Sequence, residues 1–201
     1  MNFNRKDIGI AAIAGALIAI LVLPIIDNIG LPSIFKSFGV PGVSATLFIL
    51  TVIGFIFLNA LGRWLNVLHQ IAKFIVVGGL NTFLDFAVLN FLIASSGIAS
   101  GFGFSFFKGI SFLVAVVNSY FWNKHWTFGI KANGGTEFIQ FAVVSTIGLF
   151  INVGIASFIV NAVGPVGSIT PVLWANIATL IAVAGSQIWN FLGYKFIVFR
   201  K

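Results

Sequence analysis

The sequence predicts an all-α integral membrane protein with about six transmembrane helices. Charged residues make up only 7% of the 201 residues and apolar residues 59%, whereas a soluble domain carries about 25% charged residues. The mean hydropathy is +1.11. The apolar residues form long continuous runs and not the alternating pattern of an outer-membrane barrel, so these runs indicate helices.

The first two expected spans, residues 8–26 and 43–61, form an N-terminal hairpin. A helix of about 20 residues crosses a hydrocarbon core of about 30 Å. We expect the first span to remain in the mature protein, because no small-residue cleavage pattern follows it. The Gly- and Pro-rich stretch 27–42 predicts the connecting loop, and its SIFKSF segment predicts a short helix at the interface. Residues 66–73 predict an amphipathic helix on the membrane surface that runs into the third span. Residues 1–72 predict an N-terminal unit that consists of the hairpin and a surface linker.

Four further apolar runs predict the remaining spans, at residues 74–94, 109–122, 138–160 and 172–192. Three loops separate them. The loop 95–107 is rich in Gly, Ser and Phe, the loop 124–137 is polar, and the loop 161–171 has no charged residue. A basic tail, residues 193–201, closes the chain.

The distribution of basic residues predicts the orientation. An even number of crossings places both termini on one side of the membrane. That side carries most of the cations: Arg5, Lys6, Arg63, Lys73, Lys124, Lys131, Lys195, Arg200 and Lys201. The other side is predicted to carry only Lys36 and Lys108. Because Lys and Arg accumulate in cytoplasmic loops, we expect both termini in the cytoplasm. The same rule explains the net charge of +7, so we expect no nucleic-acid partner.

An internal repeat relates the last four spans at a constant offset of 67 residues. Trp122-Asn123 recurs as Trp189-Asn190, and Gly97 recurs as Gly164, together with several apolar matches. Each copy holds two crossings, so the second copy enters from the same side as the first. This predicts two parallel two-helix repeats, at about residues 73–128 and 140–199. In transporters built from repeats, the substrate site lies between the repeats near the membrane midplane.

Three motifs stand at the ends of these spans: FIVVGGLNTFLDF at residues 74–86, NSYFWNKHWTF at 118–128 and YKFIVF at 194–199. On these motifs, residues 73–201 resemble the GtrA-like family of small four-helix membrane proteins. The resemblance implies a role in cell-surface polysaccharide synthesis, in which the protein moves a polyprenyl-phosphate-linked sugar across the cytoplasmic membrane. A membrane glycosyltransferase would make that lipid on the inner face.

The first candidate site residue is Asp85, because an ionised carboxylate within a bilayer is costly and must be paired, protonated or faced by polar groups. Asn81 shares its helix face. The repeat-equivalent of Asp85 is Asn152, and the two are predicted to face each other across the pseudo-twofold axis. Two interpretations remain open: a polar centre that binds sugar hydroxyls or carries a proton, or a carboxyl group that bonds a neighbouring helix.

Two further groups lie toward the predicted cytoplasmic ends of the spans. Amide and hydroxyl side chains there can hydrogen-bond sugar or join helices: Asn118, Tyr120, Asn123, Ser186, Gln187 and Asn190. Basic side chains there can bind a lipid phosphate or only anchor the helices: Lys124, His125 and Lys195. The sequence contains no cysteine, and His69 and His125 have no third ligand at helical spacing, so we expect no metal site.

The leading functional hypothesis is a flippase for a polyprenyl-phosphate sugar in the cytoplasmic membrane. The alternative is a non-catalytic subunit that anchors or regulates a glycosyltransferase. A small drug exporter with one membrane carboxylate is a third possibility, against which the GtrA-like motifs argue. We expect no enzymatic activity and no cofactor, because the sequence lacks paired carboxylates and a nucleophile–base pair. The expected partners are the lipid-linked sugar, membrane lipids, a membrane glycosyltransferase and a second copy of the chain.

Overall fold

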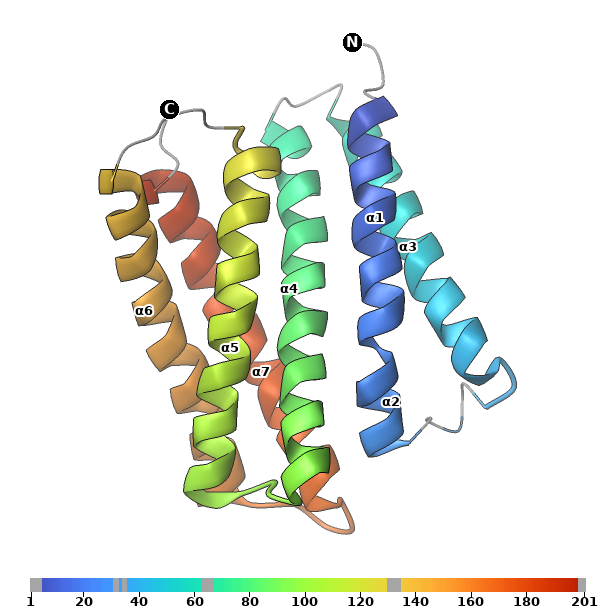
Figure 1. Cartoon of the computed structure of the whole chain (residues 1–201), viewed down its shortest axis with the longest axis vertical. Coiled ribbons are helices and arrows are strands. Elements are labelled where there is room, and N and C mark those ends of the chain that lie inside the picture. The colour runs from blue at the N-terminus through green and yellow to red at the C-terminus, as the bar shows by residue number, and fades with distance from the viewer. Residues whose placement is uncertain (1–4, 31–32, 34–35, 63–66, 130–134, 199–201) are drawn as a thin grey trace.

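The computed structural model describes residues 5–30, 33, 36–62, 67–129 and 135–198. Over these residues the chain forms helices and no strand. Six helices are long and apolar enough to cross a membrane, and they run up and down as one bundle (Figure 1). The predicted all-α membrane fold with six spans is therefore confirmed. The chain is a multi-pass membrane protein.

The N-terminal hairpin packs along one side of the bundle (Figure 1). Its first crossing consists of α1 (Arg5–Leu21) and α2 (Leu23–Ile29), and its second is α3 (Gly39–Leu61). The first crossing is interrupted at Val22, because Pro24 at the start of α2 has no backbone N–H to continue the hydrogen-bond ladder. A Cβ at Gly15 would lie 3.2–3.3 Å from Phe48 and Thr51. This glycine therefore lets α1 and α3 approach closely.

Helix α4 (Val67–Ser96) is continuous over 30 residues. Over the residues described, the segment predicted at 66–73 does run as a helix into the third span, but as part of the same helix, so its predicted place on the membrane surface is wrong. No Pro or Gly interrupts the chain between Val67 and Val77, and Ala72, Val76 and Val77 are buried in the contact with the hairpin. At 1.5 Å per residue α4 is about 45 Å long, so it extends beyond a hydrocarbon core of about 30 Å.

Helix α5 (Gly101–Trp122) begins well before the predicted start of its span at residue 109. The predicted loop 95–107 reduces to residues 97–100, since Ser95 and Ser96 still belong to α4. Gly97 and Gly101 have φ angles of 73° and 69°, a left-handed conformation that glycine adopts without strain. This short turn sets the two helices of the first repeat directly against each other.

The second repeat has the same plan. It consists of α6 (Gly135–Phe158), the π-helical turn η3 (Ile159–Val163) and α7 (Pro171–Gly193). Thr170 caps α7 by accepting a hydrogen bond from the Leu173 amide at 3.3 Å. Both second helices end in a π-helical turn, which is η2 (Asn123–Thr127) after α5 and η4 (Tyr194–Val198) after α7.

The start of α1 and the end of η4 lie at the same end of the bundle, which we call the terminal end (Figure 1). Lys73 near the start of α4, Lys124 in η2 and Lys195 in η4 belong to this end. Lys36, in the connection between α2 and α3, lies at the opposite end. Four cations used in the orientation argument lie outside the described residues: Arg63, Lys131, Arg200 and Lys201. Part of the predicted SIFKSF helix does so as well.

Candidate functional site

A small cavity lies between the four helices of the two repeats, and we call it the central cavity. Its volume is about 40 Å³. Helices α4, α5, α6 and α7 all contribute to its wall, and most of the lining residues are polar. The polar lining residues are Asn81, Thr82, Asp85, Ser119, Asn123, Asn152, Ser186, Gln187, Asn190 and Tyr194.

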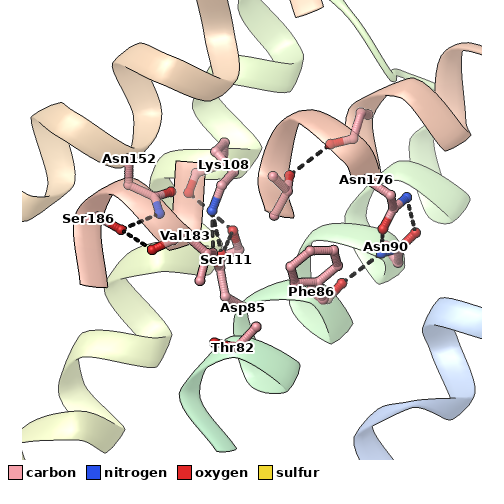
Figure 2. A network of polar contacts seen from close by, with 12 residues as sticks. Thr82, Asp85, Phe86, Asn90, Lys108, Ser111, Asn152, Asn176, Val183 and Ser186 are labelled. Carbon is pink, nitrogen blue, oxygen red and sulfur yellow. Dashed lines mark hydrogen bonds and ion pairs between the residues drawn. The ribbon is translucent and has the colours of Figure 1, made fainter. Parts of the chain in front are cut away.

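An ion pair between α4 and α5 forms one side of this region. The Lys108 ammonium nitrogen lies 2.6 Å from Asp85 Oδ2 and 2.8 Å from Oδ1. Ser111 donates a third hydrogen bond, to Oδ1, at 2.5 Å, and Figure 2 shows Lys108 and Ser111 both pointing to the carboxylate. Lys108 has no exposed surface and Asp85 is 2% exposed. Each charge thus depends on the other, because either alone would be uncompensated within the helix bundle.

The position of Lys108 corrects the sequence analysis, which placed it in the loop on the side opposite the termini. It lies two turns inside α5, because this helix begins at Gly101. A signal for this was available in the sequence. Apolar residues flank Lys108 on both sides, and an intramembrane Asp requires a counterion. In a tight α4–α5 hairpin the two charges fall at similar depths.

Two amide side chains pair between α4 and α5. Asn118 donates from Nδ2 to Asn81 Oδ1 at 2.7 Å. The positions equivalent by the 67-residue repeat are Gly148 and Gly185. A Cβ at Gly148 would collide with the Asn190 side chain. The second repeat therefore replaces an amide pair with two glycines and uses the space for Asn190.

Three amide oxygens of the cavity wall are buried and have no hydrogen-bond partner within the described residues: Asn123 Oδ1, Asn152 Oδ1 and Asn190 Oδ1. The amide nitrogens of Asn123 and Asn152 are occupied, since they donate to Ser119 at 3.0 Å and to Ser186 at 2.9 Å. Buried polar atoms are nearly always satisfied in folded proteins. These oxygens therefore provide acceptors for a donor that occupies the cavity.

A second set of amides lies beyond the cavity, away from the terminal end. Asn90 on α4 and Asn176 on α7 exchange two hydrogen bonds, at 2.7 and 3.0 Å. Asn28 on α2 donates to Asn90 Oδ1 at 2.8 Å. This chain of amides joins both repeats to the N-terminal hairpin, and Figure 2 shows Asn90 and Asn176 apart from Asp85.

The basic residues at the terminal end lie outside the cavity. Lys124 donates to the Tyr120 hydroxyl at 3.0 Å and lies 3.6 Å from Glu137 Oε1. Lys195 lies over the rings of Phe191 and Phe196, with its nitrogen 5.5 and 5.3 Å from their centroids. The compact charge of a lysine suits a phosphate, which makes these two side chains candidates for such a contact.

The comparison with protein families decides the identity of the four-helix part. The model of the GtrA/DPMS transmembrane domain matches residues 73–199, which is more than half of the chain. The protein belongs to the GtrA/DPMS family. The resemblance drawn from the sequence motifs is thereby confirmed, and both repeats fall within the matched region.

One curated relative extends this comparison. The chain is 28% identical over 148 residues to the uncharacterized membrane protein YngA of Bacillus subtilis (strain 168). The alignment covers 69% of this chain and 86% of the relative. No solved structure matches the chain significantly.

Within the GtrA/DPMS domain, the structure brings six of the ten sequence-predicted site residues together at the central cavity: Asn81, Asp85, Asn123, Asn152, Gln187 and Asn190. Asn118 lies behind them through its bond to Asn81. Lys124, His125 and Lys195 lie outside the cavity, and His125 is exposed. Asp85 and Asn152, the predicted pair across the repeat, both line the cavity from different helices.

Sequence reasoning missed the residues that complete the GtrA/DPMS site. Lys108 and Ser111 hold Asp85, and Ser119 orients the amide of Asn123. Ser186, a candidate from the sequence, orients the amide of Asn152. Ser119 and Ser186 occupy the same place in the two repeats. This coincidence of a small hydroxyl residue in both copies was the available signal.

Proposed function

We propose that this protein translocates a polyprenyl-phosphate-linked sugar across the cytoplasmic membrane, for the synthesis of a cell-surface polysaccharide. Membership of the GtrA/DPMS family supports a role in glycan synthesis. The observation that carries the proposal is the central cavity, where carboxylate, amide and hydroxyl groups meet between helices that are otherwise apolar. Sites between repeats are common in membrane transporters.

The size of the cavity limits what this conformation can hold. Small-molecule sites usually enclose about 300–1,000 Å³, whereas the central cavity encloses about 40 Å³. A cavity of this size accommodates water but not a sugar ring. Translocation would therefore require the repeats to separate, so that the structure corresponds to a closed state.

The proposed roles of the residues follow from their positions. The cavity amides would exchange hydrogen bonds with sugar hydroxyls, and the cations of the terminal end would hold the phosphate. The Asp85–Lys108 pair would supply fixed charges beside the path, and proton coupling through Asp85 would require that pair to open. We assign no catalytic reaction to these residues.

The decisive experiment measures translocation by the purified protein in proteoliposomes. A labelled polyprenyl-phosphate sugar should reach the opposite leaflet faster than in empty liposomes. The double variant Lys124→Ala/Lys195→Ala should abolish this gain, whereas Lys36→Ala, which removes an exposed cation far from the site, should not. Because Asp85→Asn alone strands the Lys108 charge, the cleaner test is the double variant Asp85→Asn/Lys108→Gln, with Asp27→Asn at an exposed helix end as its control.

The alternative is a subunit that anchors or regulates a membrane glycosyltransferase. The same polar helix faces would then contact a protein. Absence of translocation by the wild-type protein, together with stoichiometric co-purification with a glycosyltransferase, would refute the flippase and support the subunit. Membrane insertion in the cytoplasmic membrane with both termini inside is part of either proposal.

A further inference from the structure

The two repeats meet at two boundaries, one between α4 and α7 and one between α5 and α6. The wall of the central cavity is more polar toward the first boundary than toward the second. At the α4/α7 boundary its half-buried lining residues include Thr82 and Gln187, which are polar, and Gly78. At the α5/α6 boundary the half-buried lining residue is Val116, which is apolar. Polar side chains that border lipid are costly without a function, so the α4/α7 boundary is the polar route out of the cavity. We call it the seam.

An aromatic contact closes the seam at one end, and an amide pair closes it at the other. Toward the terminal end, the rings of Phe74 and Phe191 pack edge to face with centroids 4.9 Å apart. At the other end, Asn90 and Asn176 bond α4 to α7. Between these contacts the helices approach at a glycine, since a Cβ on Gly78 would lie 3.6 Å from the Gln187 amide. Within the described residues that amide has no hydrogen-bond partner.

The cavity behind the seam holds three buried unpaired acceptors and no free charge, while the Gln187 amide at the seam can both donate and accept. The Asp85 carboxylate is saturated by Lys108 and Ser111. The Ser186 hydroxyl donates to the Val183 carbonyl at 3.2 Å. It therefore accepts from Asn152, which leaves Asn152 Oδ1 free, as are the oxygens of Asn123 and Asn190. Free acceptors bind hydroxyl groups, which can donate, and not phosphate or carboxylate oxygens, which only accept.

A cation lies at the terminal end of the seam. Lys195 is half-buried over Phe191, the ring that closes the seam against Phe74. Lys73, Lys108 and Lys124 each have a carboxylate partner, whereas Lys195 forms no ion pair with any described residue. It lies five residues beyond Asn190, which is about 7.5 Å along a helix.

We infer that a lipid headgroup enters sideways through the seam between α4 and α7. Its uncharged sugar then lies against the free oxygens of Asn123, Asn152 and Asn190, and its phosphate stays outside beside Lys195. This inference rests on the proposed function and specifies the substrate class: neutral, hydroxyl-rich sugars are accepted and acidic sugars are rejected. The prenyl chain remains in the surrounding lipid.

The test uses the absence of cysteine from the chain and two matched threonines. Thr82 lines the cavity at the seam, and Thr146 lines the apolar groove between α5 and α6. Each hydroxyl bonds only the carbonyl four residues earlier in its own helix, at 2.8 Å. Thr82→Cys and Thr146→Cys therefore place a thiol on either side of the molecule with similar local changes.

The measurement is the rate at which a small, membrane-permeant maleimide labels each purified variant. A polyprenyl phosphate carrying an uncharged hexose, at ten times its Kd, should slow labelling of Thr82→Cys about tenfold and leave Thr146→Cys unchanged. The same lipid without sugar, and one carrying a hexuronic acid, should give little protection. Lys195→Gln should weaken protection by the hexose lipid.

Three results would overturn the inference: an unreactive thiol at position 82, protection at position 146 instead, or equal protection by all three lipids. If Thr82→Cys does not fold, Gly78→Cys probes the same seam, because a Cβ fits there. The assay reads binding and not transport. A protein that fails to translocate can still show the predicted protection, and an active flippase can fail to show it, so the two proposals fail separately.

Discussion

The Lys108 ammonium nitrogen lies 2.6 Å from Asp85 Oδ2, and no more than 3% of either side chain is exposed. The pair joins the two helices of the first repeat. The second repeat has no counterpart, because the positions equivalent by the 67-residue offset are Asn152 and Ala175. This buried ion pair therefore belongs to the first repeat alone.

Breaking this pair should be more harmful than removing it. Asp85→Asn leaves the Lys108 charge buried without a carboxylate, and we expect a loss of about 3–5 kcal/mol in the free energy of unfolding. The double variant Asp85→Asn/Lys108→Gln carries no buried charge and should recover most of that loss. Thermal unfolding in detergent measures both, with Asp27→Asn as the exposed control. Equal stability of the single variant and the wild type would contradict the ion pair.

The N-terminal hairpin should depend on Trp126 for its attachment. Trp126 Nε1 donates to Asp7 Oδ1 at 2.9 Å, and Asp7 Oδ2 lies 2.9 Å from the Lys73 nitrogen. Trp126→Phe keeps an aromatic ring but removes the hydrogen-bond donor. We therefore expect the free energy of unfolding to fall by about 1–2 kcal/mol. Faster proteolysis of the hairpin in Trp126→Phe than in the wild type would show this weaker attachment.

Trp122→Phe is the control for this prediction. Trp122 packs on Trp126 with ring centroids 5.9 Å apart, and its indole nitrogen has no hydrogen-bond partner within the described residues. Its replacement should therefore change proteolysis little. The same susceptibility in both variants would show that ring packing, and not the bond to Asp7, holds the hairpin.

Helices α6 and α7 should tolerate no side chain at Gly193. A Cβ there would collide with the Val144 side chain, which is β-branched and restricted at χ1. Gly193→Ala should lower the free energy of unfolding by about 1–3 kcal/mol, because it overpacks the contact. On α6, a Cβ at Gly154 would meet nothing within 4 Å, so Gly154→Ala should stabilise by up to ~1 kcal/mol. Melting temperatures that shift in the same direction would contradict the close packing at Gly193.

The positive charges predict that the terminal end faces the cytoplasm. Thr136 near the start of α6 and Ser168 in the connection before α7 are both exposed and lie at opposite ends of the bundle. In intact cells, a membrane-impermeant maleimide should label Ser168→Cys and should label Thr136→Cys only after permeabilisation. The reverse pattern would place both termini outside.

The sequence alone determined the six spans, the family and most of the cavity amides. Hydropathy and helix length depend on local composition, and a repeat of constant offset identifies equivalent positions without coordinates. The orientation stays a prediction. Of the two cations predicted at the end opposite the termini, Lys36 lies there and Lys108 does not.

Only the tertiary structure decided the partners of those residues. Which amide meets which hydroxyl depends on the rotation and register of neighbouring helices, and hydropathy does not encode either. Lys108 appeared to be a loop cation because one lysine interrupts an apolar run, yet the tight turn at Gly97 and Gly101 brings it to the depth of Asp85. In a medium without water, a buried charge must find its counterion within the fold, and the helix packing supplies it.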